Sequence, residues 1–310
     1  MTDSTKTVFE KYQVRKTKKQ KSQFIDFVSG RASEMGYDCK IESVGLGARD
    51  IVVGDPKSAK VVYTAHYDTC PRLPFPNFIT PTRIGLYLLY SLALSLAFFV
   101  IPLAIGIATD VICGLLSLGK GFSLPVALAA YVALFVLMLS GPANKNTAND
   151  NTSGVTVLLD LMEVLPEGDR ENAAFIFFDL EESGLIGSAA YFAKHRENMQ
   201  DKLVINFDCV SDGEDILFVL QKGASAYSKT IKTAYESNES CRVSVESKGV
   251  FYPSDQMCFP SGVGVAALKR SKRGVLYMDK IHTKKDVVYR EENIEFLVNG
   301  SVKLTQIMSK

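Results

Sequence analysis

Two long apolar runs constrain this sequence more than any other feature. The first run covers residues 84–108 and the second covers residues 123–141, and neither contains an Asp, Glu, Lys, Arg or His. A helix of roughly 20 apolar residues is long enough to cross the hydrocarbon core of a bilayer. Cores of globular proteins seldom use two such runs in succession. We therefore expect residues 84–141 to form a helical membrane hairpin, in preference to a buried helix pair or an apolar lid on a soluble protein.

Charges on either side of the two runs predict the orientation of this hairpin. A hairpin returns the chain to the side of the membrane that it left, so residues 1–83 and 142–310 should share one side. Arg72, Arg83 and Lys145 flank the runs, whereas the link between them contains only Asp110 and Lys120. Positive flanks favour the cytoplasmic side, so we expect a membrane protein whose outer segments are cytoplasmic. A polar N-terminus and six cysteines without a CxxC pair agree with this expectation.

Outside the hairpin, apolar strands alternate with amphipathic helices. The pattern predicts strands at 39–44, 50–54, 59–66, 173–180, 203–208, 215–221 and 263–268, and helices at 17–35, 152–165, 185–195, 225–238 and 292–308. Residues 59–66, AKVVYTAH, form the nearly continuous apolar run that is typical of a strand buried on both faces. We predict one discontinuous α/β domain, residues 1–83 with 142–310, built on a mostly parallel, doubly wound mixed sheet with helices on both faces.

The net charge, the basic residues and Cys70 have ordinary interpretations. The formal net charge of +1 gives no indication of nucleic-acid binding. The basic run at the start of the first predicted helix (Lys11, Arg15, Lys16, Lys18, Lys19, Lys21) is interpreted as a solvated face, which in a membrane-bound protein could also contact anionic lipid. Cys70 is interpreted as a small semi-buried residue in preference to a redox-sensitive thiol, and His195 as a surface or helix-end residue.

Five side chains that can bind a metal fall at predicted strand ends or in the adjoining loops: His66, Asp150, Glu182, Asp208 and His282. Each has an ordinary explanation by itself, such as a core histidine or a helix-capping aspartate. Together, two imidazoles and three carboxylates suit zinc, or else cobalt or manganese, and suffice for two ions that share a bridging acid. Asp68 lies on the same strand face as His66 and can orient its imidazole. Glu181 and Glu182 offer one carboxylate for a metal and one for proton transfer.

Six short segments make the sequence similar to a known family. They are HYD (66–68), NDNTSG (149–154), EESGLIGS (181–188), NFD (206–208), SDQMCF (254–259) and IHTKKD (281–286). In this order they resemble the co-catalytic zinc aminopeptidases of the MH clan (metallopeptidase family twenty-eight), which includes bacterial leucyl aminopeptidases and glutamate carboxypeptidase. The resemblance extends over about residues 60–290, apart from the apolar insert, and it implies a zinc exopeptidase fold.

The resemblance also implies a role for each site residue. His66 and Asp208 would bind one zinc ion, Glu182 and His282 a second, and Asp150 would bridge both. Glu181 would be the general base, Asp68 would orient His66, and the Asp150–Asn151 peptide bond would be cis. The implied activity is removal of N-terminal residues from peptide substrates by a zinc-activated water.

One departure from the family pattern leaves other functions open. The interval between His66 and Asp150 is much longer than the usual family loop, because the apolar hairpin fills it. One alternative is another zinc amidohydrolase of the same clan, such as a carboxypeptidase, a deacylase or a glutaminyl cyclase-like enzyme. A second is a catalytically inactive, membrane-anchored interaction protein on the same fold. No sequence feature selects an oligomeric state.

Overall fold

A nine-stranded mixed sheet forms the centre of the computed structural model, which describes residues 1–73, 75 and 77–310. The strands follow the order β1-β2-β4-β3-β5-β8-β6-β7, with β9 beside β8. Their bounds are β1 (Cys39–Val44), β2 (Ala48–Val53), β3 (Val61–His66), β4 (Ala173–Phe178), β5 (Leu203–Phe207), β6 (Asp215–Leu220), β7 (Arg242–Glu246), β8 (Gly262–Arg270) and β9 (Leu276–Tyr277).

The middle of this sheet is parallel and its margins are mixed. Strands β4, β3, β5 and β8 pair in parallel, as do β6 and β7. Strand β1 pairs antiparallel with β2, β2 with β4, and β6 with β8. Every residue of β3, β4 and β5 is buried, as expected for parallel strands covered on both faces. The predicted fold class is therefore confirmed.

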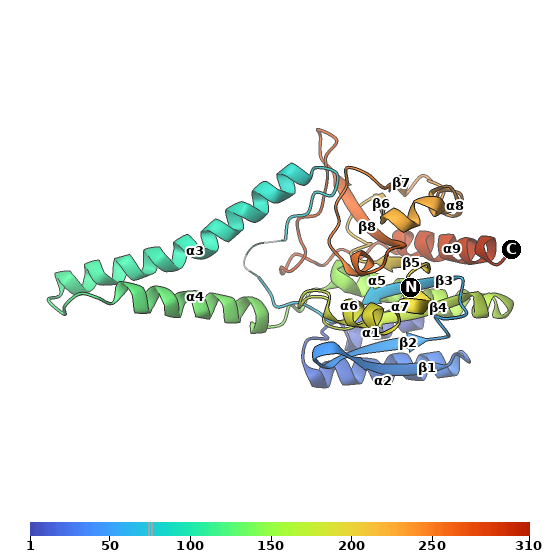
Figure 1. Cartoon of the computed structure of the whole chain (residues 1–310), viewed down its shortest axis with the longest axis horizontal. Helices are drawn as coiled ribbons and strands as arrows, with labels where there is room; N and C mark the ends of the chain where they lie inside the picture. Colours follow the sequence, from blue (N-terminus) through green and yellow to red (C-terminus); the bar gives the residue numbers. More distant parts are fainter. Residues whose placement is uncertain (74, 76) are drawn as a thin grey trace.

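Helices cover both faces of the sheet (Figure 1). The larger apolar cluster joins one face to α1 (Asp3–Lys11), α2 (Lys18–Glu34), α5 (Gly154–Val164), α8 (Ser228–Ala234) and α9 (Glu291–Met308). A smaller cluster joins the opposite face to α6 (Ile186–Lys194) and α7 (Arg196–Met199). Strand alternation produces this division, because Val61, Tyr63 and Ala65 enter the larger cluster while Val62 enters the smaller one.

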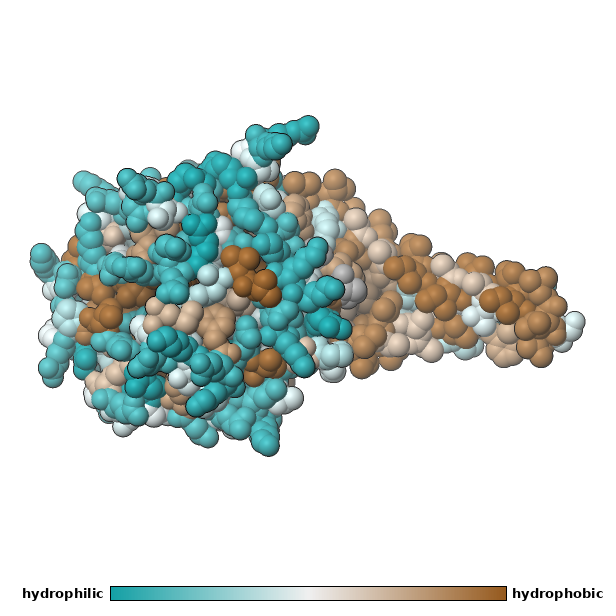
Figure 2. Space-filling view, turned by 180° about the vertical axis from the view of Figure 1, so that it is seen from behind, coloured by the Kyte–Doolittle hydropathy of each residue, from teal (hydrophilic) through white to brown (hydrophobic). Residues whose placement is uncertain are grey.

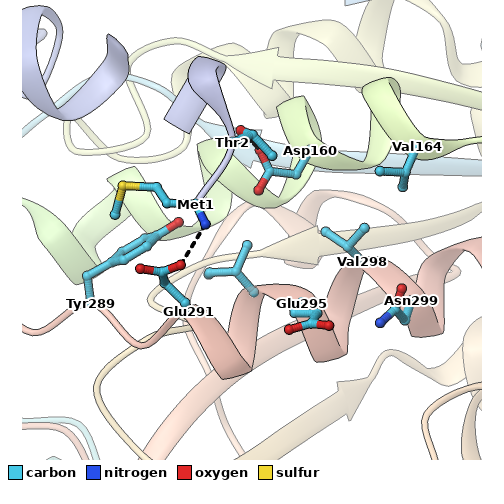
Figure 3. A pocket seen from close by; sticks show the side chains of 10 residues that line it. Met1, Thr2, Asp160, Val164, Tyr289, Glu291, Glu295, Val298 and Asn299 are labelled. Atoms are coloured by element: carbon cyan, nitrogen blue, oxygen red, sulfur yellow. Dashed lines mark hydrogen bonds and ion pairs between the residues drawn. The ribbon is translucent and has the colours of Figure 1, made fainter. Parts of the chain in front are cut away.

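The sequence pattern did not predict α1, β7 or β9. Helix α1 depends on tertiary contacts at its start, where Thr2 and Thr5 donate hydrogen bonds to Asp160 Oδ1 at 2.6 and 2.9 Å. The amino group of Met1 lies 2.6 Å from Glu291 Oε2, which ties the N-terminus to α9 beside a small surface pocket (Figure 3). The helix expected at 225–238 is shorter, because a 3-10 turn (Lys222–Tyr227) precedes α8 and the chain leaves α8 at Tyr235 to enter β7.

Two apolar helices project from the body as a hairpin (Figure 1): α3 (Ile84–Leu115) and α4 (Ser123–Ser140). Both are long and apolar enough to cross a membrane, and only 6% of the most apolar window of each is buried in the chain. Figure 2 shows the hairpin as a largely hydrophobic arm on a body whose visible face is mostly hydrophilic.

The link between the two helices is shorter than predicted. Asp110 lies within α3, and its carboxylate accepts hydrogen bonds from the backbone N–H groups of Gly121, Phe122 and Ser123 at 3.1, 2.7 and 3.1 Å. The charge thus satisfies free N–H groups where α4 begins. A local pattern of apolar residues cannot reveal this partner in the next helix.

Two backbone hydrogen bonds join the segments that precede and follow the hairpin, residues 70–72 and 142–144, which we call the neck. The backbone N–H of Arg72 donates to the carbonyl of Pro142 at 2.8 Å, and that of Asn144 donates to the carbonyl of Cys70 at 3.1 Å. These bonds join the chain on either side of the insert. The division into one domain of residues 1–83 with 142–310 and a hairpin of residues 84–141 stays a prediction. The rings of Tyr87 in α3 and Phe251 in the body lie 5.8 Å apart.

Candidate metal centre

The five predicted ligands converge at one edge of the sheet. His66 is the last residue of β3, Glu182 follows β4, and Asp208 follows β5 directly. Asp150 lies in the turn before α5, and His282 lies in the loop between β9 and α9. Carboxyl ends of parallel strands form the usual ligand-binding edge of an open α/β sheet. His66, Asp150 and Asp208 are between 1% and 5% exposed, whereas the His282 side chain is 18% exposed, so the His66 part of the site is the more deeply buried.

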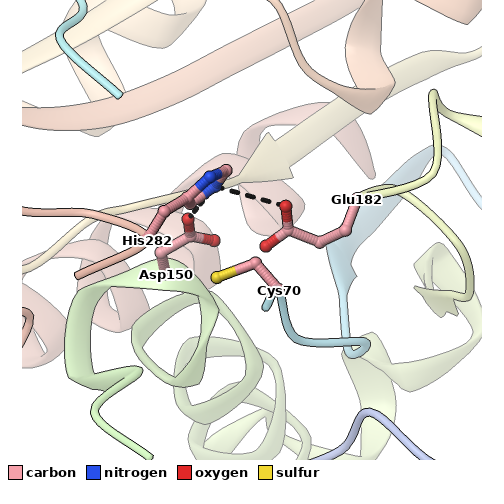
Figure 4. A group of neighbouring side chains, drawn as sticks. All are labelled: Cys70, Asp150, Glu182 and His282. Atoms are coloured by element: carbon pink, nitrogen blue, oxygen red, sulfur yellow. Dashed lines mark ion pairs between the residues drawn. The ribbon is translucent and has the colours of Figure 1, made fainter. Parts of the chain in front are cut away.

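Asp150 is shared between two groups of donor atoms. His66 Nε2 lies 3.3 Å from Asp150 Oδ1 and 3.6 Å from Asp208 Oδ1. His282 Nε2 lies 3.0 Å from Asp150 Oδ2 and 3.2 Å from Glu182 Oε2 (Figure 4). One carboxylate oxygen of Asp150 therefore faces each histidine, which is the arrangement a bridging ligand needs.

The chemistry of these residues fits zinc. Imidazole and carboxylate are ordinary zinc ligands. Oε1 of Glu182 is buried and has no hydrogen-bond partner among the described residues, which is costly for a carboxylate unless a cation satisfies it. Burial also raises the pKa of Glu182, against the opposing effect of His282. The site thus concentrates buried acceptors that a cation would satisfy.

Asp68 holds the loop that carries the paired glutamates. Its Oδ1 and Oδ2 accept hydrogen bonds from the backbone N–H groups of Glu181 and Glu182 at 3.0 and 3.3 Å. Its Oδ1 lies 3.5 Å from His66 Nδ1, while its own carbonyl oxygen lies closer to that nitrogen, at 3.1 Å. Asp68 therefore contacts His66 through both backbone and side chain. Burial raises the pKa of Glu181 well above its ordinary value, although His66 opposes this shift.

Two further residues shape the turn around Asp150. Both oxygens of Asp286 accept backbone N–H groups, from Asn149 at 2.8 Å and from Asp150 at 3.0 Å. The side chain of Asn151 donates to the carbonyl of Phe207 at 2.9 Å and accepts from the N–H of Gly154 at 3.0 Å. The Asp150–Asn151 peptide bond is cis, as the resemblance implied. Sequence reasoning assigned no role to Asp286, although it lies only four residues after His282.

Gly154 is required where this turn approaches β5. A Cβ at this position would lie 2.2 Å from the carbonyl oxygen of Phe207, a distance that real Cβ atoms do not show. The glycine of NDNTSG therefore allows the Asp150 turn to approach the strand that precedes Asp208.

Two members of the predicted basic face are buried, contrary to expectation. Arg15 is 0% exposed and donates to the carbonyl of Tyr67 and, at 3.2 Å, to the hydroxyl of Thr152. Burial lowers the pKa of Arg15 to about 10, an effect that Asp68 and Asp150 oppose. Lys21 is also buried and contacts Asp179 at 2.5 Å. The clustering of charges in the sequence favours a solvated face, but the residues that bury Arg15 and Lys21 come from distant segments of the chain.

Cys70 lies within the site, whereas His195 lies outside it. Cys70 is 1% exposed, and its sulfur belongs to a set of mutually close donors with Asp150, Glu182 and His282 (Figure 4). His195 lies outside both donor groups. It caps the C-terminal end of α6, and its Nε2 lies 2.8 Å from Glu42 Oε2.

Solved structures share this fold at low sequence identity. The Legionella pneumophila LapA aminopeptidase is 14% identical with a TM-score of 0.56, and the match covers 99% of this chain and 70% of that one. The Porphyromonas gingivalis glutaminyl cyclase is 13% identical with a TM-score of 0.57, over 98% of this chain and 97% of that one. A Zn-dependent exopeptidase from Parabacteroides distasonis is 16% identical with a TM-score of 0.53, over 98% and 97%.

The sequence comparisons identify the family. No curated protein matches the sequence. The model of peptidase family M28 matches residues 133–300, which include Asp150, Glu182, Asp208 and His282. Because this match covers more than half of the chain and the fold is that of zinc exopeptidases, the protein belongs to peptidase family M28.

Proposed function

We propose that this protein is a membrane-anchored zinc aminopeptidase that removes N-terminal residues from peptides. The observation that supports it most is the position of Asp150, whose two oxygens face His66 on one side and His282 on the other. A bridging carboxylate between two donor groups is suited to two metal ions. Membership of the M28 family supports a metallopeptidase-type activity.

The donor groups suggest which residues hold each ion. His66, Asp208 and Asp150 would hold one ion, and Glu182, His282 and Asp150 the other, with cobalt or manganese as possible substitutes for zinc. When bound, zinc supplies Lewis-acid polarisation of a carbonyl and of water. His66, Asp150 and Asp208 are almost fully buried, which strengthens the electrostatic interactions among them.

Glu181 is the proposed general base. It precedes the proposed ligand Glu182 and belongs to neither donor group, so its carboxylate stays available for proton transfer. Asp68 fixes its backbone through the N–H bond of 3.0 Å. In this role Glu181 takes a proton from the attacking water and delivers it to the leaving amine.

A substrate panel tests the proposal. Purified protein in detergent is given amino-acyl amides with a free or an acetylated amino group, peptides with a free or a blocked carboxylate, and a peptide that begins with glutamine. We expect cleavage of free-amine substrates only, abolished by a chelator and restored by zinc. Glu181→Gln should lower kcat by a factor of about 10²–10⁴ without loss of zinc, as is typical for removal of a general acid–base.

The control variant is Glu167→Gln, which changes an exposed glutamate in the turn before β4 and should leave the rate unchanged. Cyclisation of the glutamine peptide without cleavage of the others would replace the proposal with a glutaminyl cyclase activity. No turnover of any substrate by zinc-loaded protein would overturn it in favour of an inactive scaffold.

We also propose that α3 and α4 anchor the protein in a membrane with the body on the cytoplasmic side. Their length, composition and exposure support insertion. Arg72, Arg83 and Lys145 at the body end support the orientation.

A further inference from the structure

Cys70 occupies a place that the proposed ligand set does not explain. It lies four residues after His66 in the loop that leads to the hairpin, and it is 1% exposed. One donor atom from each of Cys70, Asp150, Glu182 and His282 can be chosen so that all four lie within 4.8 Å of one another. Figure 4 shows the Cys70 sulfur beside the carboxylates of Asp150 and Glu182.

A second observation also points to a ligand at this place. Oε1 of Glu182 is buried with no hydrogen-bond partner among the described residues, and its side chain is only 9% exposed. The carboxylate is therefore incompletely satisfied beside the sulfur. Imidazole, carboxylate and thiolate together form a donor set that zinc prefers and that magnesium or calcium does not.

The two halves of the site differ in the number of their donors. The half around His66 contains three side chains, His66, Asp150 and Asp208, whereas the half around His282 contains four. Four protein donors close a tetrahedral zinc site, while three leave a position for water or substrate.

The neck of the hairpin fixes the position of the thiol. The carbonyl of Cys70 accepts the N–H of Asn144, and the side chain of Asn144 donates to the carbonyl of Thr283 at 3.1 Å. Thr283 follows His282 directly. Hydrogen bonds thus join the two chain segments of the neck to the His282 loop. They hold the Cys70 sulfur and the His282 imidazole on the same side of the site.

We propose that Cys70 is a thiolate ligand of the metal ion held by Asp150, Glu182 and His282. On zinc binding the thiol loses its proton to solvent and a zinc–sulfur bond forms, with no change in oxidation state. The site of this ion then has four protein ligands and is selective for thiophilic metals. The site at His66 has three protein ligands and keeps a coordination position for water or substrate. The inference rests on the metal centre of the proposed function but not on its substrate.

X-ray absorption of the zinc-loaded full-length protein tests the ligand directly. We expect a zinc–sulfur shell at about 2.3 Å, distinct from nitrogen and oxygen ligands at about 2.0–2.2 Å. It should amount to about one sulfur for every two zinc ions if both halves are filled. Cobalt-loaded protein should show thiolate-to-cobalt charge-transfer absorption. Cys70→Ser should remove both signals and weaken binding of one zinc by about tenfold or more, because even outer-shell partners contribute about 10–100-fold.

Cys209→Ser is the matched control. Cys209 is also buried beside a proposed ligand, and its thiol donates to Asp208 Oδ1 at 3.0 Å, but it belongs to neither donor group found among the described residues. Its loss should leave the sulfur shell intact. Zinc-loaded protein without a sulfur shell, or a shell that persists in Cys70→Ser, would overturn the inference while the metal centre stands. Failure to bind zinc at all would overturn both.

Discussion

At the scale of single residues, the site depends on carboxylates that do not themselves face a metal. Asp68 and Asp286 each accept two backbone N–H groups from a loop that carries proposed ligands. Such bonds fix the ligands before a metal arrives, so less ordering is required on binding. Asp68 fixes the backbone that carries Glu182, and Asp286 fixes the backbone that carries Asp150.

Asp286→Ala should loosen the Asp150 turn, because it removes the acceptor for two buried N–H groups. We expect zinc affinity to fall by about 10–100-fold, as for other residues that support metal ligands. Competition with a chromophoric chelator measures this change. Asp201→Ala, at an exposed position, is the control, and equal affinities in the two variants would contradict the prediction.

Asp50 predicts a pH dependence of stability. Its Oδ1 accepts the N–H of Asp179 at 2.9 Å, its Oδ2 has no partner among the described residues, and burial raises its pKa to about 8. The ordinary pKa of an aspartate is near 3.8, so the folded state holds this proton more tightly than the unfolded state. The resulting stabilisation is complete below about pH 4 and is lost as the pH rises through about 8.

Asp50→Asn keeps an oxygen for the N–H of Asp179 and removes the ionisation. Between pH 6 and pH 9 we expect the wild type to lose stability relative to this variant, as measured by thermal unfolding of zinc-free protein. Asp26→Asn, on the exposed side of α2, should follow the wild type. Parallel stability curves for the wild type and Asp50→Asn would refute the argument.

At the scale of elements, a close approach of backbones sets the position of α5. Gly154 begins this helix, and a Cβ there would lie 2.2 Å from the Phe207 carbonyl oxygen. Gly30 lies in the exposed middle of α2, where a Cβ would meet nothing within 4 Å. The two glycines therefore differ in what an added methyl group would do.

Gly154→Ala should displace α5 or β5 and destabilise the protein by roughly 1–3 kcal/mol, the usual cost of overpacking. It should also weaken zinc binding, because Asp150 and Asp208 lie on either side of the contact. Gly30→Ala should stabilise by roughly 0.5–1 kcal/mol, since alanine favours a helix interior. Denaturant unfolding measures both changes, and effects of the same sign would contradict this account.

The sequence predicted most of the body because its signals are local. Strands such as β3 and β4 are continuous apolar runs, and the proposed ligands lie where those runs end. The features that were missed depend on distant partners. Helix α1 is held by Asp160, Arg15 is buried against Tyr67 and Thr152, and Asp110 reaches the start of α4. No periodic pattern encodes such contacts.

At the scale of the whole molecule, the hairpin contacts the body at the base of its helices, through the neck, the rings of Tyr87 and Phe251, and a hydrogen bond from Lys16 to the carbonyl of Leu139. Replacement of residues 84–140 by a short flexible linker should therefore leave the body folded. We expect the shortened protein to bind zinc without detergent. Full-length protein should remain in membranes after alkaline extraction, whereas the shortened form should be released.

Protease digestion of vesicles of known orientation measures the side on which the body lies. The body should be cleaved only where the cytoplasmic face is exposed. If the full-length protein instead forms a stable oligomer in buffer without detergent, the apolar hairpins of neighbouring copies cover one another and do not insert in a membrane.

Unequal helix lengths have a consequence for access to the site. Helix α3 has 32 residues and α4 has 18, which correspond to about 48 Å and about 27 Å. A hydrocarbon core of about 30 Å accommodates α4 entirely, whereas α3 exceeds it by about 18 Å. Because α4 leads directly into Gly141 and the neck, the body would be held close to the lipid surface, and the first turns of α3, where Tyr87 contacts Phe251, would lie beside the body outside the hydrocarbon core. The active site would therefore lie at a fixed height above the lipid. Substrates tethered to the same membrane would then be sorted by the length of their free N-terminal tails.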